Sequence, residues 1–162
     1  MKSILLTKQL LKNMNELELT DLALENQNRP YEGASFWVNN IHFRSRMAKL
    51  TPKKPGYFVT LWEKGSDGKN QPFKYEECPD KIIISIIDGN LNGQFIFNKD
   101  ILLEKGVLRS EDTEGKMAVR VYPSWISDLN PSASKTKEWQ NEYFVDLTDE
   151  CPQERIKELY LS

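Results

Sequence analysis

Two residues that can act together in metal-dependent chemistry, Glu32 and Lys49, flank a predicted β-hairpin. The dipeptide Asn39-Asn40 favours a two-residue turn, because asparagine tolerates a positive φ. Alternation along the two strands then brings Glu32 opposite Met47 and diagonal to Lys49, within reach of long side chains. A carboxylate can hold Mg²⁺, and a neighbouring lysine can orient an attacking water or stabilise developing charge. The hairpin is therefore a candidate catalytic site.

This layout resembles the site of the restriction-endonuclease-like, PD-(D/E)xK, nucleases, in which two carboxylates hold Mg²⁺. Met47 stands where the second carboxylate belongs, and a neutral thioether is a poor ligand for Mg²⁺. The resemblance therefore predicts a degenerate site at Glu32 and Lys49, with no bound metal or other cofactor. One alternative is an active nuclease that uses Mg²⁺ and recruits Glu63 as its second carboxylate. Another is that Glu32 and Lys49 form a simple cross-strand ion pair.

Charge is distributed unevenly along the chain, although the formal net charge is only -2. Residues 28–75 carry nine basic and three acidic side chains, whereas residues 76–162 carry ten basic and seventeen acidic ones. The central segment therefore has a local excess of +6, which suggests an anionic partner. A solvated, lysine-rich surface without a partner is the alternative. If the excess is functional, phosphate contacts are expected from one strand face and the loop after it, at Arg44, Arg46, Lys53 and Lys54.

The rest of the composition narrows the classes of function. The chain has 162 residues, the size of one domain, and a single histidine, His42, which excludes zinc sites with several imidazoles. Cys78 and Cys151 form no C-x-x-C motif, so a zinc ribbon or thioredoxin-like motif is also excluded. No apolar run is long enough for a signal peptide or a membrane span. We therefore expect a cytoplasmic protein with reduced thiols and no membrane partner.

The pattern of apolar residues predicts one domain of mixed α and β structure. Apolar spacing predicts an N-terminal helix capped by Thr7, and a short helical turn is expected at 21–25. The near-continuous β-branched run at 82–87 is typical of a strand buried on both faces. Further strands are expected at 35–38, 41–47, 56–63, 93–97 and 117–122. Helices are expected at 98–105, where Gly106 ends the helix, and at 133–144 and 153–160. This order predicts a single α/β (α+β) domain, with a mixed twisted sheet that includes an N-terminal hairpin and is flanked by helices.

Several stretches between residues 31 and 144 resemble the MepB-like family of small bacterial proteins. The matching stretches are Tyr31–Phe36, His42–Lys54, Phe58–Lys64, Gly68–Phe73, Gly93–Phe97, Gly115–Met117, Arg120–Trp125 and Lys137–Gln140. The resemblance implies a restriction-endonuclease-like fold and DNA binding. It adds further candidate contacts to nucleic acid, namely Lys64, Lys116, Arg120, Lys137 and Gln140.

Together these observations favour a DNA-binding protein that contacts mostly the phosphate backbone and has no working nuclease centre. The active nuclease remains the second hypothesis. The third is a module that uses the same basic surface to bind an acidic protein or a small anion.

Overall fold

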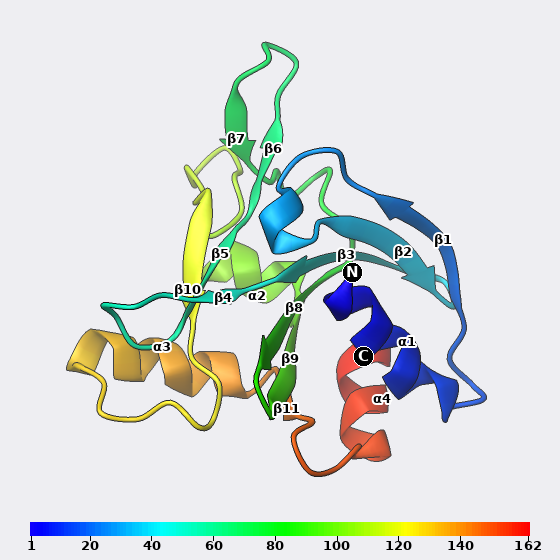
Figure 1. The fold of residues 1–162 in the computed structure, drawn as a ribbon. Helices are drawn as coiled ribbons and strands as arrows, with labels where there is room; N and C mark the ends of the chain where they lie inside the picture. The colour runs from blue at the N-terminus through cyan, green and yellow to red at the C-terminus, as the bar shows by residue number, and fades with distance from the viewer.

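A six-stranded mixed sheet forms the centre of the computed structural model, which describes residues 1–162 (Figure 1). In spatial order its strands are β1 (Leu19–Leu24), β2 (Ala34–Val38), β3 (Ile41–Met47), β8 (Lys81–Asp88), β9 (Leu91–Asn98) and β11 (Phe144–Asp146). Only β3 and β8 run parallel, and every other neighbouring pair is antiparallel. The predicted mixed sheet in a domain of α and β structure is confirmed.

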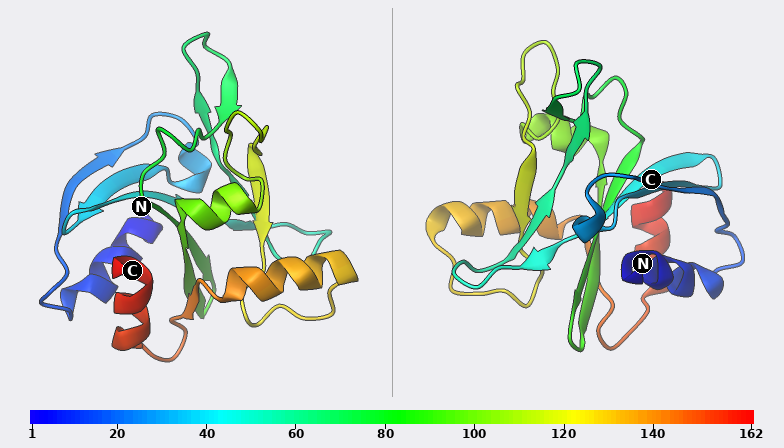
Figure 2. Two further views of the ribbon diagram at one scale, coloured as in Figure 1. Left: turned by 180° about the vertical axis from the view of Figure 1, so that it is seen from behind. Right: turned by 45° about the horizontal axis from the view of Figure 1, so that its top comes forward.

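Two helices cover one face of this sheet and lie side by side near the chain termini (Figures 1 and 2). They are α1 (Lys2–Lys12) and α4 (Gln153–Leu161). Their apolar side chains join a core with Phe36, Phe43 and Ile83 from the sheet. Burying each of these large side chains contributes about 1.5–3 kcal/mol.

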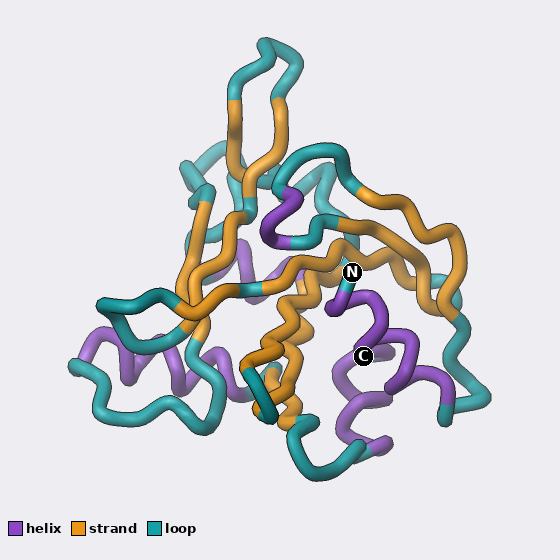
Figure 3. Tube along the Cα trace, in the orientation of Figure 1, coloured by secondary structure: helices purple, strands orange, loops and turns teal.

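A second layer covers the opposite face. It contains a three-stranded antiparallel sheet, the helices α2 and α3, and a hairpin that projects from the body (Figure 3). The small sheet consists of β10 (Ala118–Val121), β5 (Tyr57–Thr60) and β4 (Lys49–Leu50), in that order. The helices are α2 (Lys99–Glu104) and α3 (Pro131–Asn141), and the hairpin is β6 (Trp62–Lys64) with β7 (Asn70–Pro72).

The isoleucine run in β8 shows why both layers are needed. Ile82, Ile84 and Ile86 pack into the core under the small sheet, whereas Ile83 packs under α1 and α4. All four side chains are fully buried. The prediction of a strand buried on both faces is therefore confirmed.

The predicted hairpin register is confirmed up to the end of β2. Val38 pairs with Ile41 across the Asn39-Asn40 turn, and Asn39 has a φ of 55°. The pairing continues to Ala34 and Ser45 and stops there.

Two local predictions near the N-terminus are wrong. Residues 21–25 lie mostly in the edge strand β1 rather than in a helical turn, because pairing with β2 outweighs their weak helical preference. Thr7 does not cap α1, which begins at Lys2. Its buried hydroxyl instead donates to the carbonyl of Ser3, one turn earlier in the helix.

The C-terminal part of the chain follows its local signals more closely. Asn98 caps α2 by accepting a hydrogen bond from the amide of Ile101, and Gly106 follows that helix with a φ of 77°. Helix α3 starts at Pro131 and ends at Asn141, earlier than predicted, because Phe144 enters β11 beside β9. No helix in the structure combines the length and apolar character needed to cross a bilayer.

Candidate nucleic-acid interface

Glu32 lies directly after a 3₁₀ turn, η1 (Arg29–Tyr31), and its carboxylate is already engaged. It accepts hydrogen bonds from the amide of Ser3 at 2.8 Å and from the Ser3 hydroxyl at 2.7 Å. These contacts stabilise the first turn of α1, where backbone amides lack partners and negative charge is favourable. The geometry gives Glu32 a structural role at the N-terminus of that helix.

Lys49 is not paired with Glu32, and the predicted ion pair between them does not form. Hairpin pairing stops before Glu32, and Lys49 instead enters β4, where it pairs with Phe58. Its ammonium lies 5.6 Å from the centre of the Tyr31 ring. Glu32 and Lys49 therefore each contact a different group, and no ion pair joins them.

Glu63, the carboxylate named for an active nuclease, is also committed elsewhere. It accepts a 3.0 Å hydrogen bond from Nη1 of Arg44. No group of three His, Cys, Asp or Glu side chains in the structure has a geometry that could hold a metal ion.

Arg44 and Arg46 lie beneath the second layer instead of on an open strand face. The Arg46 side chain is completely buried, and its Nη1 lies 2.7 Å from Oε2 of Glu25. The Nε atom of Arg44 lies 3.1 Å from Oε1 of the same carboxylate. The Phe73 ring covers both guanidinium groups, with its centre 4.1 Å from that of Arg44 and 5.4 Å from that of Arg46.

The expectation that these two arginines contact phosphates is therefore corrected. Burial lowers the pKa of Arg46 to about 10, while the Glu25 carboxylate acts in the opposite direction, so the guanidinium remains charged at neutral pH. Its Nε and Nη2 atoms are buried without a hydrogen-bond partner, which adds to the cost of burying this charge. Gly33 leaves the space that the pair requires, because a Cβ there would lie 2.4 Å from Glu25 and 2.8 Å from Arg46.

A different cationic surface is exposed on the outer side of the small sheet. Phe58 on β5 pairs with Lys49 on β4 and with Arg120 on β10, so these three side chains form a row across one face. Arg120 also donates to the Thr51 hydroxyl and to the carbonyl of Lys54. The loop that carries the predicted residues Lys53 and Lys54 is thereby tied to this row.

We call this surface the basic face; it consists of Lys49, Lys53, Lys54, Lys116 and Arg120. None of these five side chains forms an ion pair with a carboxylate. The four lysines are exposed, and Arg120 is half-buried. Four of the predicted contact residues, Lys53, Lys54, Lys116 and Arg120, therefore lie on the basic face, whereas the place of Lys49 there was not predicted.

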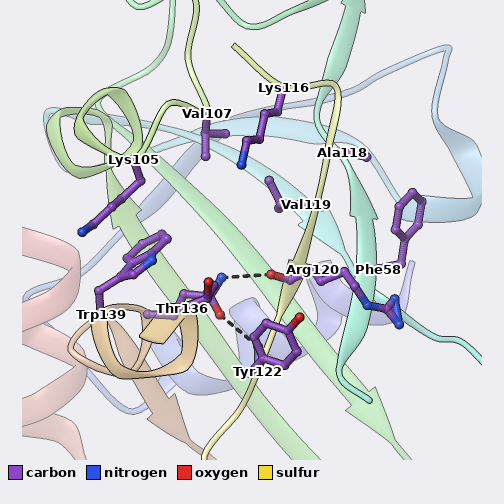
Figure 4. A pocket seen from close by; sticks show the side chains of 11 residues that line it. Phe58, Lys105, Val107, Lys116, Ala118, Val119, Arg120, Tyr122, Thr136 and Trp139 are labelled. Carbon is purple, nitrogen blue, oxygen red and sulfur yellow. Dashed lines mark hydrogen bonds between the residues drawn. The ribbon is translucent and has the colours of Figure 1, made fainter. Parts of the chain in front are cut away.

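A cavity of about 340 Å³ opens beside the basic face, between β10 and α3 (Figure 4). Its wall includes three cationic side chains, those of Lys105, Lys116 and Arg120, and no carboxylate. The remaining lining is largely apolar and aromatic, with contributions from Phe58, Val107, Ala118, Val119, Tyr122, Thr136, Trp139 and Gln140. Lys105 and Trp139 were not predicted as site residues, because their local sequence carries no signal beyond a helix end and an apolar helix position.

Gln140 and Lys137 have structural roles that differ from the predicted contacts to DNA. The Gln140 amide accepts from the backbone N–H of Tyr122 and donates to the carbonyl of Arg120, so it satisfies the open edge of β10 as a neighbouring strand would. The Lys137 ammonium donates to the carbonyls of Ser124 and Ile126. Lys64 is exposed on the projecting hairpin, 5.7 Å from the centre of the Trp62 ring.

The fold and this site define a mixed α+β protein with a concentrated basic surface on its second sheet. The chain belongs to the MepB-like family, whose sequence model matches residues 25–146. It is similar to the protein in the crystal structure of MepB, with 40% sequence identity and a TM-score of 0.81, over 93% of this chain and 99% of that chain.

A second solved structure, of the bacterial homing endonuclease I-Ssp6803I, aligns over 85% of each chain with a TM-score of 0.45 and 11% identity. None of the curated proteins matches this chain in sequence.

Proposed function

We propose that this protein binds nucleic acid, with DNA as the expected form, through phosphate contacts on the basic face. The observation that carries the proposal is the row of Lys49, Phe58 and Arg120 with the adjoining lysines, which has no carboxylate partners. An uncompensated cationic surface attracts a polyanion and releases its counterions. The overall charge of -2 favours binding confined to this face.

Binding without cleavage is the form of the function that the geometry supports. The resemblance to nucleases puts Met47 where a second carboxylate is needed. In the structure, Glu32 stabilises the start of α1 and Glu63 holds Arg44. We propose the cytoplasm as the compartment, because Cys78 and Cys151 are both free thiols.

Fluorescence anisotropy with a labelled DNA duplex tests the proposal. Four phosphate contacts would lower the affinity on the order of 10²-fold between about 50 and about 200 mM salt. The double variant Lys53→Glu with Lys54→Glu should weaken binding and flatten this salt dependence. A matched charge reversal on the opposite side of the central sheet, Lys8→Glu with Lys12→Glu, should have a much smaller effect. Equal effects of the two double variants, or no binding at low salt, would refute the proposal.

Incubation of plasmid DNA with Mg²⁺ or Mn²⁺ tests the absence of cleavage. We expect intact plasmid with either metal. Cleavage that disappears in Glu32→Ala would instead support the active nuclease.

A further inference from the structure

The cavity between β10 and α3 is lined by both apolar and cationic side chains. Val107, Val119 and the Trp139 ring supply apolar surface, and Lys105, Lys116 and Arg120 supply positive charge. Figure 4 shows the Lys116 side chain reaching down from the rim between the two valines. A ligand that fits this cavity therefore needs an apolar or aromatic part and an anionic part.

The cations of the cavity are available to such a ligand. Lys116 has no ion-pair partner, and Lys105 has only the exposed carboxylate of Glu104, at 3.9 Å. The Lys105 ammonium lies 5.6 Å from the centre of the Trp139 ring, so one side of the cavity presents a cation and an aromatic surface together. The Nε atom of Arg120 is buried and has no hydrogen-bond partner.

The wall formed by α3 is held in place before any ligand arrives. Gln140 joins this helix to the edge of β10 through two hydrogen bonds, both 2.9 Å long. The Trp139 ring packs against Phe97 of the core, with the ring centres 5.5 Å apart. A preformed aromatic wall reduces the entropy that binding must overcome.

We infer that this cavity receives a single unstacked nucleotide, with its phosphate near Lys116 and its base against Trp139 and Val119. The volume is in the range of pockets that hold small ligands, and bases stack on aromatic side chains whatever their sequence. A base inside a duplex is not available for such a contact, whereas a single strand can present one. The inference rests on the proposed nucleic-acid binding and assigns one nucleotide of the bound strand to this cavity.

Binding of a labelled short oligothymidylate, compared with binding of a duplex of the same length, tests this inference. Thr136 lines the cavity one turn before Trp139, so Thr136→Phe should fill the space beside the ring. We expect this variant to weaken single-strand binding about tenfold and to leave duplex binding unchanged. The matched control Ser134→Phe adds the same bulk to α3 outside the cavity and should change neither affinity.

Titration with thymidine 5′-monophosphate, observed through the indole NMR signal of Trp139, separates the two parts of the ligand. The signal is assigned with Trp139→Phe, and thymidine alone and inorganic phosphate alone serve as comparison probes. We expect the nucleotide to shift this signal at lower concentration than either probe does, and Lys116→Glu to weaken the response. Thymidine 5′-monophosphate that leaves the signal unmoved would overturn the inference.

The two experiments also separate the inference from the function on which it rests. Salt-dependent DNA binding that Thr136→Phe leaves unchanged for single strand and duplex would overturn the nucleotide cavity and preserve the proposed function. A response to thymidine 5′-monophosphate without binding of any oligonucleotide would overturn the proposed function and support a site for free nucleotides.

Discussion

Replacing Glu25 with glutamine should strongly destabilise this protein, because the Glu25 carboxylate faces two arginine side chains beneath the second layer. Arg46 is completely buried, and Arg44 and Glu25 are 20% and 16% exposed. Removing one member of a buried charge pair costs about 3–5 kcal/mol, since the remaining charge stays desolvated. Partial exposure of Glu25 places the expected loss near the lower end, at about 3 kcal/mol. That is a large fraction of the about 5–15 kcal/mol that holds a domain folded.

Urea unfolding followed by tryptophan fluorescence measures this loss. With a denaturant slope of about 2 kcal/mol per M, the midpoint should fall by about 1.5 M. Glu16→Gln removes the carboxylate from an exposed ion pair with Lys157 and should leave the midpoint nearly unchanged. The double variant Glu25→Gln with Arg46→Met should lose less stability than the two single variants together, because it leaves no buried, unpaired charge at these two positions.

A Glu25→Gln midpoint that matches the parent would refute the buried network. Arg46→Met provides a second check, because Arg46 lies away from solvent and should not contribute to DNA binding. Its folded fraction should bind DNA as the parent does. A stable Arg46→Met variant with weakened DNA affinity would show that this arginine contacts phosphate after all.

Three further predictions concern other buried polar groups. Gln140→Leu should lower stability by about 1–3 kcal/mol in urea unfolding, because it leaves the Tyr122 amide and the Arg120 carbonyl at the edge of β10 without partners. An unchanged midpoint would argue against this role. Burial raises the pKa of Cys78 to about 11, so a thiol reagent at neutral pH should modify exposed Cys151 quickly and Cys78 only on unfolding. Equal rates of modification at the two thiols would contradict this expectation. Because the pKa is higher in the folded state, the Cys78 contribution to stability should also decline as the pH rises through about 9 to 11. Lys81→Met should weaken the docking of α4, because the Lys81 ammonium donates to the Leu159 and Ser162 carbonyls at the end of that helix. Unchanged amide hydrogen exchange in α4 would count against this role of Lys81.

Local sequence signals predicted the parts of the fold in which neighbouring residues decide the outcome. The Asn39-Asn40 turn and strict alternation set the register between β2 and β3, and Gly106 marked the end of α2. The unbroken isoleucine run in β8 indicated burial on both faces. In these places the turn chemistry, capping and apolar pattern are encoded within a few residues.

The position of the candidate site depended on contacts that no local pattern contains. Alternation showed that Arg44 and Arg46 share a strand face, but only the tertiary structure showed that Glu25 and Phe73 cover that face. Glu25 itself follows an edge strand whose sequence favours a helical turn in isolation.

The sequence alone determined that this is one domain of mixed α and β structure, with a positive excess in residues 28–75 and the stretches of its family. Only the tertiary structure decided which of those positive charges face solvent. Pairing of β10 with β5 joins Arg120 to the loop of Lys53 and Lys54, which precedes it by more than sixty residues in the sequence. Burial and the location of a counter-charge are properties of long-range packing, so net charge and periodicity cannot distinguish a buried arginine from one that binds a phosphate.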